Sequence, residues 1–237
     1  MKLTIVIPMY NEEKIAAGTA RQVEAFLAEN FPDSEAVFVN DGSTDGTEAA
    51  FLSALPQCPH LRLAGYEKNR GKGCAVRTGM LEGKGDIILF TDCDLAYGLD
   101  IIKEFTEKNA SCDVCIGSRA LHPEGYAGYS FLRKLMSRMY LLVVRLAAGF
   151  SWSDSQSGIK SFTNAAAKRI FGDPRCLTDG FAFDLEALML ADSFGMSVTE
   201  IPVKIINHRE SHINPVKDTL RMLRQLREIK KRVGGRK

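Results

Sequence analysis

The sequence has no segment of the kind that anchors a chain in a membrane or exports it. No apolar run reaches the roughly 20 residues that a spanning helix requires. The nearest candidate, residues 139–150, is short and contains Arg145. The first residues, MKLTIVIPMYNEE, lack a small-residue cleavage site and continue directly into a strand-like segment. We therefore expect a protein that stays in the cytoplasm and does not span a membrane.

Soft metal ligands are too sparse for a zinc site. Cys112 and Cys115 form a C-x-x-C pair, but neither a second pair nor a histidine cluster completes the usual set of four ligands. The six cysteines are scattered, and a chain of 237 residues does not need disulfide bonds to be stable. We interpret all six as reduced thiols.

Internal repeats and low-complexity stretches are absent as well, and the total charge is small. With 45% apolar and 25% charged residues, the 237 residues can bury one core, which argues for a single folded domain. The net charge of +2 gives no indication of nucleic-acid binding. Residues 215–237 nevertheless hold nine Lys or Arg and two acidic residues, a net charge of +7, so the other residues total −5. Such a basic tail favours contact with an anionic partner.

What the sequence does contain is a regular alternation of strand-like and helix-like segments. The strands are short, apolar and rich in β-branched residues, and we expect them at residues 3–8, 35–41, 61–66, 86–92 and 112–119. Helical patterns lie between them at residues 13–30, 47–55, 73–82 and 99–109. This order predicts an α/β fold with a mostly parallel sheet and helices on both faces. Ligands bind such sheets beyond the carboxyl ends of the strands.

After residue 119 the pattern changes. A loop rich in Gly and Tyr leads to a long basic and apolar helix at residues 130–148, and a second loop covers residues 151–158. Helices at residues 164–171 and 183–194, a strand at residues 198–206 and a C-terminal helix follow. The apolar residues of that last helix recur at helical spacing and are Val216, Leu220, Leu223, Leu226, Ile229 and Val233. This stripe either lies in an anionic membrane surface or packs on the domain.

The first polar motif follows the second strand. Residues 38–47, FVNDGSTDGT, place Asp41 and Asp45 between an apolar strand and a helix. A turn of this kind can bring carboxylate and backbone groups to the ribose and base of a nucleotide. The same residues also form a good loop and helix cap, so a purely structural role remains open.

A second polar motif follows the fourth strand. Asp92 and Asp94 lie one residue apart directly after the apolar segment DIILFT. Carboxylates at that spacing can share a hard cation that bridges a diphosphate, because Mg²⁺ and Mn²⁺ prefer oxygen ligands. The alternative is a solvated loop with two acidic residues.

Between these two motifs, residues 69–79 read NRGKGCAVRTG. Two glycines flank Lys72 just before a helix, a shape that suits close approach to a phosphate. The stretch does not match the pattern G-x-x-x-x-G-K-[ST], so an ATPase has little support. An ordinary turn from strand to helix explains the same residues.

Together these segments resemble the glycosyltransferases of family 2, which have the GT-A fold. The resemblance rests on four motifs in order, at residues 7–12 (IPMYNE), 40–47, 69–79 and 92–94. It implies a nucleotide-sugar donor bound by residues 1–119, with Mg²⁺ or Mn²⁺ held by Asp94 and Asp92. The donor-binding residues that it implies are Pro8, Tyr10, Glu12, Asp41, Lys72 and Asp92.

The second half is similar to the polyprenyl or dolichyl phosphate hexose synthases of that family. The matching stretches are GSRA (117–120), LRKLMSR (132–138), DSQSGIKSF (154–162) and FAFDLEAL (181–188). This similarity implies that residues 120–213 form the half that takes a lipid-linked phosphate at the inner face of the membrane, and that Arg119, Arg133 and Arg138 bind its phosphate. The planar guanidinium suits phosphate oxygens, although surface arginines of an amphipathic helix fit the pattern too. Residues 214–237 would then be a basic amphipathic helix after a GT-A domain of residues 1–213.

The chemistry implied is one displacement with inversion. An oxygen of the lipid phosphate attacks the anomeric carbon and displaces the nucleoside diphosphate, and no strong base is needed because a phosphate monoester, with a second pKa of about 6, is already ionised. A cation offsets the charge that grows on the leaving diphosphate. We expect Asp92 and Asp94 to act there, and Asp154 and Gln156 to position sugar hydroxyls or the acceptor loop. Lys160 is either a further phosphate contact or a solvated lysine.

The chain departs from the family pattern at three places. Asn40 stands where many relatives have an aspartate, and His208 stands where an aromatic residue is common. Ala96 and Tyr97 follow the D-x-D motif where mannose-transferring relatives usually have Gln and His. Because glucose-transferring relatives resemble this chain at Ala96, we expect UDP-glucose as the donor, with GDP-mannose as the alternative.

Two hypotheses from other classes have less support. A sugar nucleotidyltransferase would show a Gly-rich signature in the first strand, whereas this strand ends in PMYNEE. A membrane scaffold without activity has no reason to keep Asp41, Asp92 and Asp94 together.

Overall fold

The computed structural model describes residues 1–127, 139, 141–146, 148–149, 152–207 and 215–234, and for residues 215–222 the backbone only. The strands are β1 (Leu3–Met9), β2 (Glu35–Asp41), β3 (Leu61–Tyr66), β4 (Ile87–Thr91), β5 (Val114–Ser118), β6 (Ile159–Thr163) and β7 (Val198–Pro202). The helices are α1 (Ala16–Asn30), α2 (Thr47–Ala54), the 3₁₀ helix η1 (Leu55–Gln57), α3 (Lys72–Glu82), α4 (Ile101–Lys108), α6 (Asn164–Phe171), α7 (Phe183–Ser193) and α8 (Pro215–Val233).

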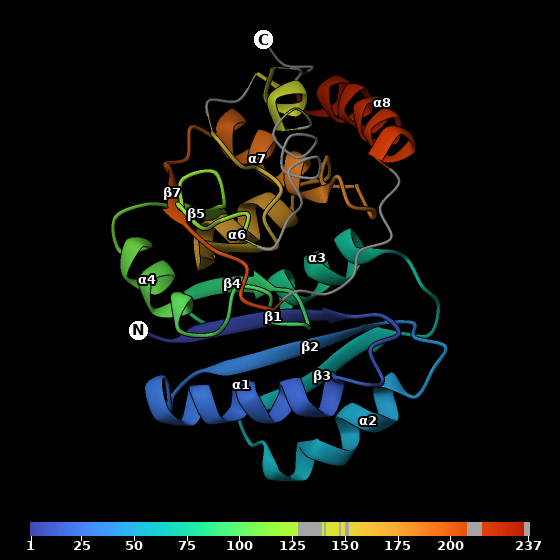
Figure 1. Ribbon diagram of the computed structural model, residues 1–237, viewed down its shortest axis with the longest axis vertical. Coiled ribbons are helices and arrows are strands. Elements are labelled where there is room, and N and C mark those ends of the chain that lie inside the picture. The colour runs from blue at the N-terminus through green and yellow to red at the C-terminus, as the bar shows by residue number, and fades with distance from the viewer. Residues whose placement is uncertain (128–138, 140, 147, 150–151, 208–214, 235–237) are drawn as a thin grey trace.

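The strands form one sheet in the order β3-β2-β1-β4-β6-β5-β7 (Figure 1). All neighbouring strands run parallel except β6, which lies antiparallel between β4 and β5. The predicted mostly parallel sheet is therefore confirmed. β6 was not expected as a strand, because its second residue, Lys160, interrupts the apolar pattern. It comes from the second half of the chain and joins two strands of the first half.

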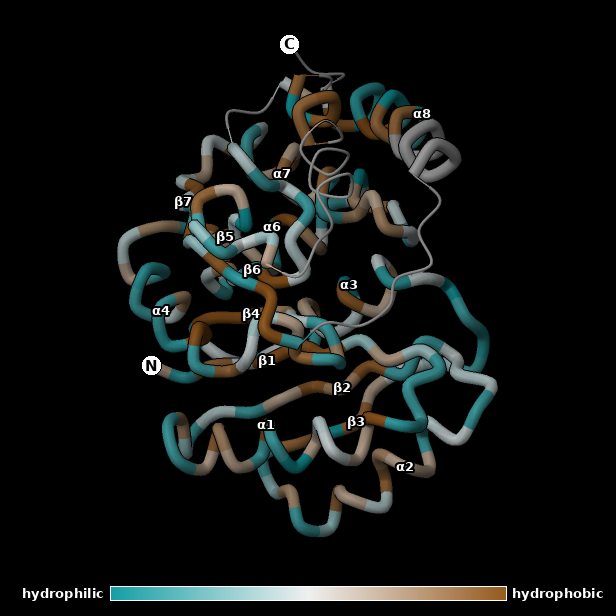
Figure 2. The backbone as a smooth tube through the Cα atoms, in the orientation of Figure 1, coloured by the Kyte–Doolittle hydropathy of each residue, from teal (hydrophilic) through white to brown (hydrophobic). Residues whose placement is uncertain are grey.

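Side chains alternate between the two faces of the sheet, as a strand's period of two requires. On β1, Val6 points to the face covered by α3, α6, α7 and α8, whereas Ile5 and Ile7 point to the face covered by α1, α2 and α4. Figure 2 shows the strands as mostly hydrophobic between helices with more hydrophilic outer surfaces. The predicted layer of helices on each face is present.

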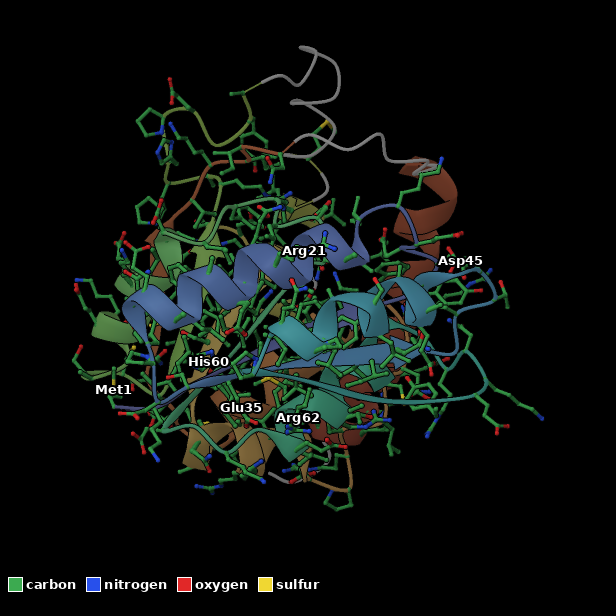
Figure 3. All side chains as sticks on the ribbon, turned by 90° about the horizontal axis from the view of Figure 1, so that it is seen from below. Met1, Arg21, Glu35, Asp45, His60 and Arg62 are labelled. Atoms are coloured by element: carbon green, nitrogen blue, oxygen red, sulfur yellow. The ribbon has the colours of Figure 1, made fainter. Side chains whose placement is uncertain are left out.

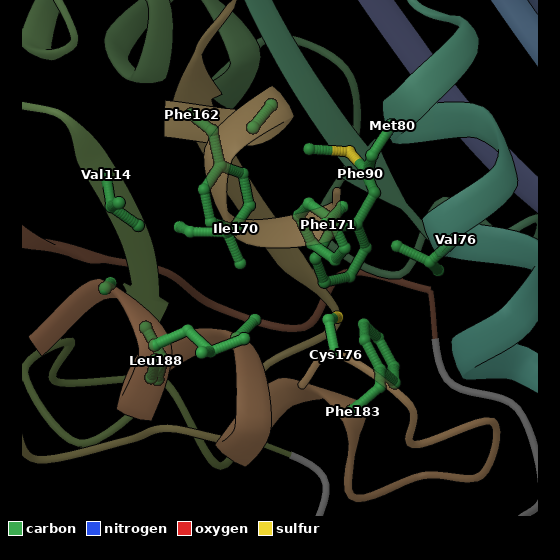
Figure 4. Close-up of a cluster of buried hydrophobic side chains, with 14 of the residues drawn as sticks. Val76, Met80, Phe90, Val114, Phe162, Ile170, Phe171, Cys176, Phe183 and Leu188 are labelled. Carbon is green, nitrogen blue, oxygen red and sulfur yellow. The ribbon is translucent and has the colours of Figure 1, made fainter. Parts of the chain in front are cut away.

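The face toward α7 holds a dense aromatic core (Figure 4). The rings of Phe90 and Phe183 have centroids 5.4 Å apart, and those of Phe162 and Phe171 are also 5.4 Å apart. All four side chains are at most 3% exposed. Burial of each stabilises the fold by about 1.5–3 kcal/mol. Because Phe90 precedes the D-x-D motif by two residues, this core fixes the base of that motif.

The opposite face is covered by α1 and α2, seen from below in Figure 3. The edge strand β3 is tied to its neighbour by Arg62, whose Nε donates to Glu35 of β2 at 2.9 Å. Burial alone would raise the pKa of Glu35, but the hydrogen bonds from Arg62 and from the Lys84 N–H outweigh it and lower the pKa.

The six cysteines, all described, are buried free thiols, as expected.

The C-terminal helix packs on the domain along its second half. Leu226, Ile229 and Val233 are at most 6% exposed and join the same core cluster as α7. Arg232 donates to Glu186 of α7 at 2.5 Å. Of the two alternatives for the apolar stripe, packing therefore holds for these residues. The helix predicted at residues 130–148 is helical at each of its described positions from 139 to 148. Among the described residues, no helix is both long and apolar enough to cross a membrane.

The predicted last strand, residues 198–206, ends early. β7 pairs only with β5, and the last residue of β5, Ser118, lies opposite Pro202. Beyond Pro202 the chain has no strand to pair with and turns toward the end of β4, where Ile206 contacts the backbone of Ala96.

Candidate active site

The polar residues singled out in the sequence gather at one edge of the sheet. Because β1, β2, β3, β4, β5 and β7 are parallel, their carboxyl ends share that edge, and the loop before the antiparallel β6 reaches it from the other direction. This is the edge at which α/β sheets bind ligands. It holds the loops that follow β1, β2 and β4, together with Arg119 after β5 and residues 152–158 before β6.

The loop after β1 is hydrogen-bonded to the loop after β2. Pro8 lies beside Val39 in the sheet, Tyr10 is 45% exposed and Glu12 is partly buried. Asn11 has a positive φ of 55° and accepts a hydrogen bond from the Thr44 N–H at 2.9 Å. The strand-one motif and the D-G-S-T-D turn are therefore one connected structure.

Asp41 holds the loop that leads into α3. Its carboxylate is 2% exposed and accepts hydrogen bonds from Tyr66 Oη (2.7 Å), Asn69 Nδ2 (2.9 Å), Arg70 N (2.9 Å) and Gly71 N (3.0 Å). Burial and the neighbouring carboxylate raise the pKa of Tyr66. The predicted site residue is thus in place, and what the structure shows is its role in positioning this loop.

The substitution of Asn40 for aspartate has a local explanation. Asn40 Nδ2 donates to Glu48 Oε2 at 2.7 Å, and Asn40 Oδ1 accepts from the Ser43 N–H at 3.0 Å. A carboxylate at this position could only accept hydrogen bonds and would repel Glu48. Asparagine here keeps the turn and α2 together.

The glycines around Lys72 permit a close approach, but to the chain's own backbone. A Cβ at Gly71 would lie 2.5 Å from the Asp179 carbonyl oxygen, and one at Gly73 would lie 2.4 Å from that of Thr178. Gly73 N donates to Asp179 O at 2.7 Å, so this first-turn amide of α3 is occupied. At these two glycines the structure shows a strand-to-helix turn packed on its own chain, and the phosphate contact expected of Lys72 stays a prediction.

The D-x-D motif brings two carboxylates together at this edge. Asp92 forms an ion pair with Lys72 Nζ and packs against Gly158, where a Cβ would lie 2.3 Å from Asp92 Oδ2. Asp94 is half-buried and accepts from the Ala96 N–H at 3.1 Å. Burial, and next the charge of Asp92, raise the pKa of the Asp94 carboxyl. The site therefore gains from an added positive charge.

A hard divalent cation fits these two carboxylates. Mg²⁺ and related ions take one or two protein carboxylates and complete their shell with phosphate and water oxygens. Over the residues that the structure describes, no group of three or more His, Cys, Asp or Glu side chains could hold a metal.

Tyr97, which follows the D-x-D motif, is engaged within the fold. Its side chain is 8% exposed, and its hydroxyl oxygen accepts from the Gly158 N–H at 3.3 Å. It supports the loop against which Asp92 packs. Burial raises the pKa of this phenol, so it stays protonated.

Lys160 lies directly beneath the site. It is fully buried in β6 opposite Phe90, and its Nζ is 2.8 Å from Asp184 Oδ1 and 2.7 Å from the Ser157 carbonyl oxygen. Both expectations for Lys160, a phosphate contact and a solvated lysine, are wrong. The F-A-F-D-x-E stretch is explained as well, because Phe183 packs on Phe90 and Asp184 neutralises Lys160.

Arg119 and Asp154, assigned to separate roles from the sequence, form one buried ion pair. Arg119 Nε donates to Asp154 Oδ2 at 2.7 Å and Nη2 to Oδ1 at 3.0 Å. Asp154 is fully buried and also accepts from the Gln156 N–H at 3.1 Å. Burial alone would raise the pKa of Asp154, but Arg119 outweighs it and lowers the pKa. Asp154 therefore orients Arg119 and the partly buried Gln156.

Glu200 was not singled out in the sequence. Glu200 of β7 accepts hydrogen bonds from Ser153 N (2.9 Å), Ser153 Oγ (2.6 Å) and Asp154 N (3.3 Å), and so anchors the loop before β6. The only signal in the sequence is an acidic residue inside a strand pattern. Arg133, Arg138 and His208 lie outside the described residues.

Comparisons with known proteins agree with this geometry. The model of a protein family described as "Glycosyl transferase family 2" matches residues 4–171. A dolichyl-phosphate beta-glucosyltransferase of Trichomonas vaginalis is 34% identical over 214 residues, which cover 85% of this chain and 63% of that protein, less than two thirds of its length. Proteins of the same name from Drosophila melanogaster (31% identical, 95% of this chain, 73% of theirs) and Homo sapiens (30%, 98% and 75%) are also similar.

A solved structure has the same fold. It is glucosyl-3-phosphoglycerate synthase from Mycobacterium tuberculosis, crystallised with Mn²⁺, uridine diphosphate and glucosyl-3-phosphoglycerate. The TM-score is 0.71 at 19% identity, over 98% of this chain and 80% of that chain.

The buried ion pair beneath the site should be necessary for folding stability. Lys160→Met leaves Asp184 buried without its cation, and we expect a loss of about 3–5 kcal/mol in the free energy of unfolding, measured with urea. The double variant Lys160→Met/Asp184→Leu should recover most of that loss. Lys204→Met, which breaks the exposed pair with Glu124, serves as the control and should cost less than about 1 kcal/mol. Equal losses in the single and double variants would contradict the pairing.

Asp94 should reduce stability when no cation is bound. Its pKa is raised in the folded state, so its charge at neutral pH destabilises the fold, and stability increases as the pH falls through that pKa. Asp94→Asn should therefore raise the unfolding temperature of the metal-free protein at pH 7. If Mn²⁺ with UDP raises the unfolding temperature of the wild type, Asp94→Asn should abolish that increase. Asp100→Asn, at a side chain that is 99% exposed, is the control. A lower unfolding temperature for Asp94→Asn would show that the carboxylate is not under strain.

Proposed function

Because this chain belongs to glycosyltransferase family 2 and has the GT-A fold, we propose that it transfers glucose from UDP-glucose to a dolichyl or polyprenyl phosphate. The observation that carries the proposal is that an acidic motif and a positioned arginine share one edge of the sheet. The D-x-D motif suits a cation and a diphosphate, and the half-buried Arg119 suits the phosphate of a second substrate. The loop before β6 separates them, because Gly158 contacts Asp92 and Asp154 binds Arg119.

On the donor side, Asp94 and Asp92 would hold Mg²⁺ or Mn²⁺. The cation would supply the positive charge that a leaving diphosphate requires. Lys72 is placed to share that task, because its ammonium group already lies against Asp92. The glucosyltransferase names of the relatives support glucose, and the solved structure with Mn²⁺ and uridine diphosphate supports the nucleotide and the metal.

On the acceptor side, Arg119 would bind the lipid phosphate. Its guanidinium is held in one orientation by the two hydrogen bonds to Asp154, which reduces the entropy lost when a phosphate binds. Asp154 is not placed as a general base, since Arg119 keeps it ionised and occupied. None is needed, because a phosphate monoester with a second pKa of about 6 is mostly ionised at neutral pH. Its oxygen attacks the anomeric carbon, the bond to the diphosphate breaks, and the configuration inverts.

A lipid acceptor would bring the chain to the inner face of a membrane as a peripheral protein. The outward face of α8 is basic, with Arg224, Arg227, Lys230 and Lys231 all exposed. The neighbouring helical residues Met139, Leu142 and Leu146 are 54–73% exposed. α8 and the described helical residues between 139 and 148 lie at one end of the molecule (Figure 1), and their basic and apolar side chains suit an anionic lipid surface.

A transfer assay tests the proposed reaction. Radiolabelled UDP-glucose and GDP-mannose are each incubated with the protein, Mn²⁺ and a polyprenyl phosphate, and the extracted lipid is counted. We expect faster transfer from UDP-glucose, complete loss in EDTA with recovery on added Mn²⁺, and no transfer by Asp94→Ala, while Asp100→Ala stays active. Faster transfer from GDP-mannose would favour the mannosyltransferase. If the protein instead converts UDP-glucose and added inorganic diphosphate to UTP and glucose 1-phosphate, it is a nucleotidyltransferase.

Vesicle binding tests the membrane proposal. The triple variant Arg227→Glu/Lys230→Glu/Lys231→Glu changes only exposed side chains of α8, and we expect it to lose cosedimentation with anionic vesicles because each basic residue near the surface contributes about 1 kcal/mol. A control with the same change of charge on other elements is Lys14→Glu/Lys84→Glu/Lys108→Glu. If both triple variants bind equally well, α8 is not the membrane contact.

A further inference from the structure

Ile206 and Asn207, which follow β7, lie across the D-x-D turn and donate hydrogen bonds to its backbone. Ile206 N donates to Ala96 O at 2.8 Å, and Asn207 N donates to the same oxygen at 3.3 Å. The side-chain amide of Asn207 donates to Asp94 O at 3.2 Å and to Leu95 O at 3.0 Å. Three consecutive carbonyl groups, from Asp94 to Ala96, thus receive their donors from two residues more than 100 positions later in the chain.

The turn that they hold is conformationally unfavourable. Leu95 has a φ of +49°, in the left-handed region that a branched side chain rarely adopts, and its side chain is only 3% exposed. Gly98 follows with a φ of +74°, and a Cβ there would lie 2.6 Å from Ile206 Cδ1. A backbone of this kind persists only where its surroundings hold it. The contact with residues 206 and 207 is one such constraint.

On its outer side, this turn borders an open cleft of about 570 Å³ and not the hydrophobic core. The residues that line the cleft include Leu95, Gly98, Ile206 and Asn207, together with Phe26 and Asn30 of α1. Water can therefore compete for the turn's carbonyl groups wherever the protein does not bind them. Asn207 is itself exposed, so its amide acts by its hydrogen bonds and not by filling space.

We propose that Asn207 is a positioning residue for Asp94: its side-chain amide locks the Asp94–Leu95 turn so that the Asp94 carboxylate faces the cation and the diphosphate. The proposal rests on the proposed function, because that function makes Asp94 a metal ligand. Residues that orient a metal ligand without touching the metal typically contribute tenfold or more to metal affinity. The amide hydrogens of Asn207 supply this orientation through the backbone.

Hydrogen exchange tests the turn directly, with no substrate present. The amides of Leu95, Ala96 and Gly98 are each hydrogen-bonded within the turn. In Asn207→Ala they should exchange about tenfold faster than in the wild type. Asn207→Asp keeps the size of the side chain but removes both donors, so it should behave like Asn207→Ala. Asn30→Ala removes an amide-to-carbonyl hydrogen bond beside the same cleft, and its exchange in the turn should not change.

Mn²⁺ affinity tests the consequence for the site. With UDP present, electron paramagnetic resonance titration should show Mn²⁺ binding about tenfold more weakly in Asn207→Ala and Asn207→Asp, a change of ~1.4 kcal/mol. Transfer should lose kcat with little change in the KM for the lipid phosphate. Unchanged exchange, or unchanged Mn²⁺ affinity despite faster exchange, would overturn the proposal. The proposal would also be overturned if Asn207→Asp kept the exchange rates and the Mn²⁺ affinity of the wild type. That result would mean that the size of the side chain is important and its hydrogen-bond donors are not. If the wild type binds no Mn²⁺, the proposed function fails instead, and the exchange data alone decide whether Asn207 holds the turn.

Discussion

A lysine buried in the middle of a sheet has to be neutralised where it lies, and this requirement organises the site. Lys160 occupies β6 beneath the D-x-D motif, and Asp184 at the start of α7 is its counter-charge. The pair fixes where α7 begins, and Phe183 then packs on Phe90 of β4. The segment before α7 in turn covers the glycines at the start of α3, and therefore sets the position of Lys72. The floor beneath the D-x-D motif thus depends on one ion pair.

The sequence alone predicted the features that depend on residues close together in the chain. The parallel strands were predictable because each is a short apolar run bounded by turn residues. Asp92 and Asp94 were predictable because two acidic residues follow such a run directly, and parallel strands bring their carboxyl ends to one edge. The position of Asp41 followed from the same rule. Its partners from β3 and the following loop could not be inferred, since they depend on which strand lies beside β2.

What the sequence could not show are pairings between distant residues. Arg119 and Asp154 each fit a substrate role when taken alone, and only the adjacency of β5 and β6 reveals that they bind each other. The glycines beside Lys72 have the composition of a phosphate loop, but Thr178 and Asp179 occupy the space that their missing side chains leave. β6 was not recognised because a charged residue such as Lys160 in a strand normally indicates an exposed face. Its burial depends on the counter-charge of Asp184, which lies 24 residues away in the sequence. These residues serve the site by holding other groups.

The antiparallel strand between β4 and β5 also determines the order in which the sheet can be completed during synthesis. The first five strands leave the ribosome before β6 does, yet β4 and β5 do not pair with each other. Until residues 159–163 arrive, β4 presents an unpaired edge, and such edges are where nascent chains associate with one another. Pairing across so long a stretch is intrinsically slow. A nascent chain of this fold therefore passes through an aggregation-prone stage, and a chain truncated before residue 159 would remain in it.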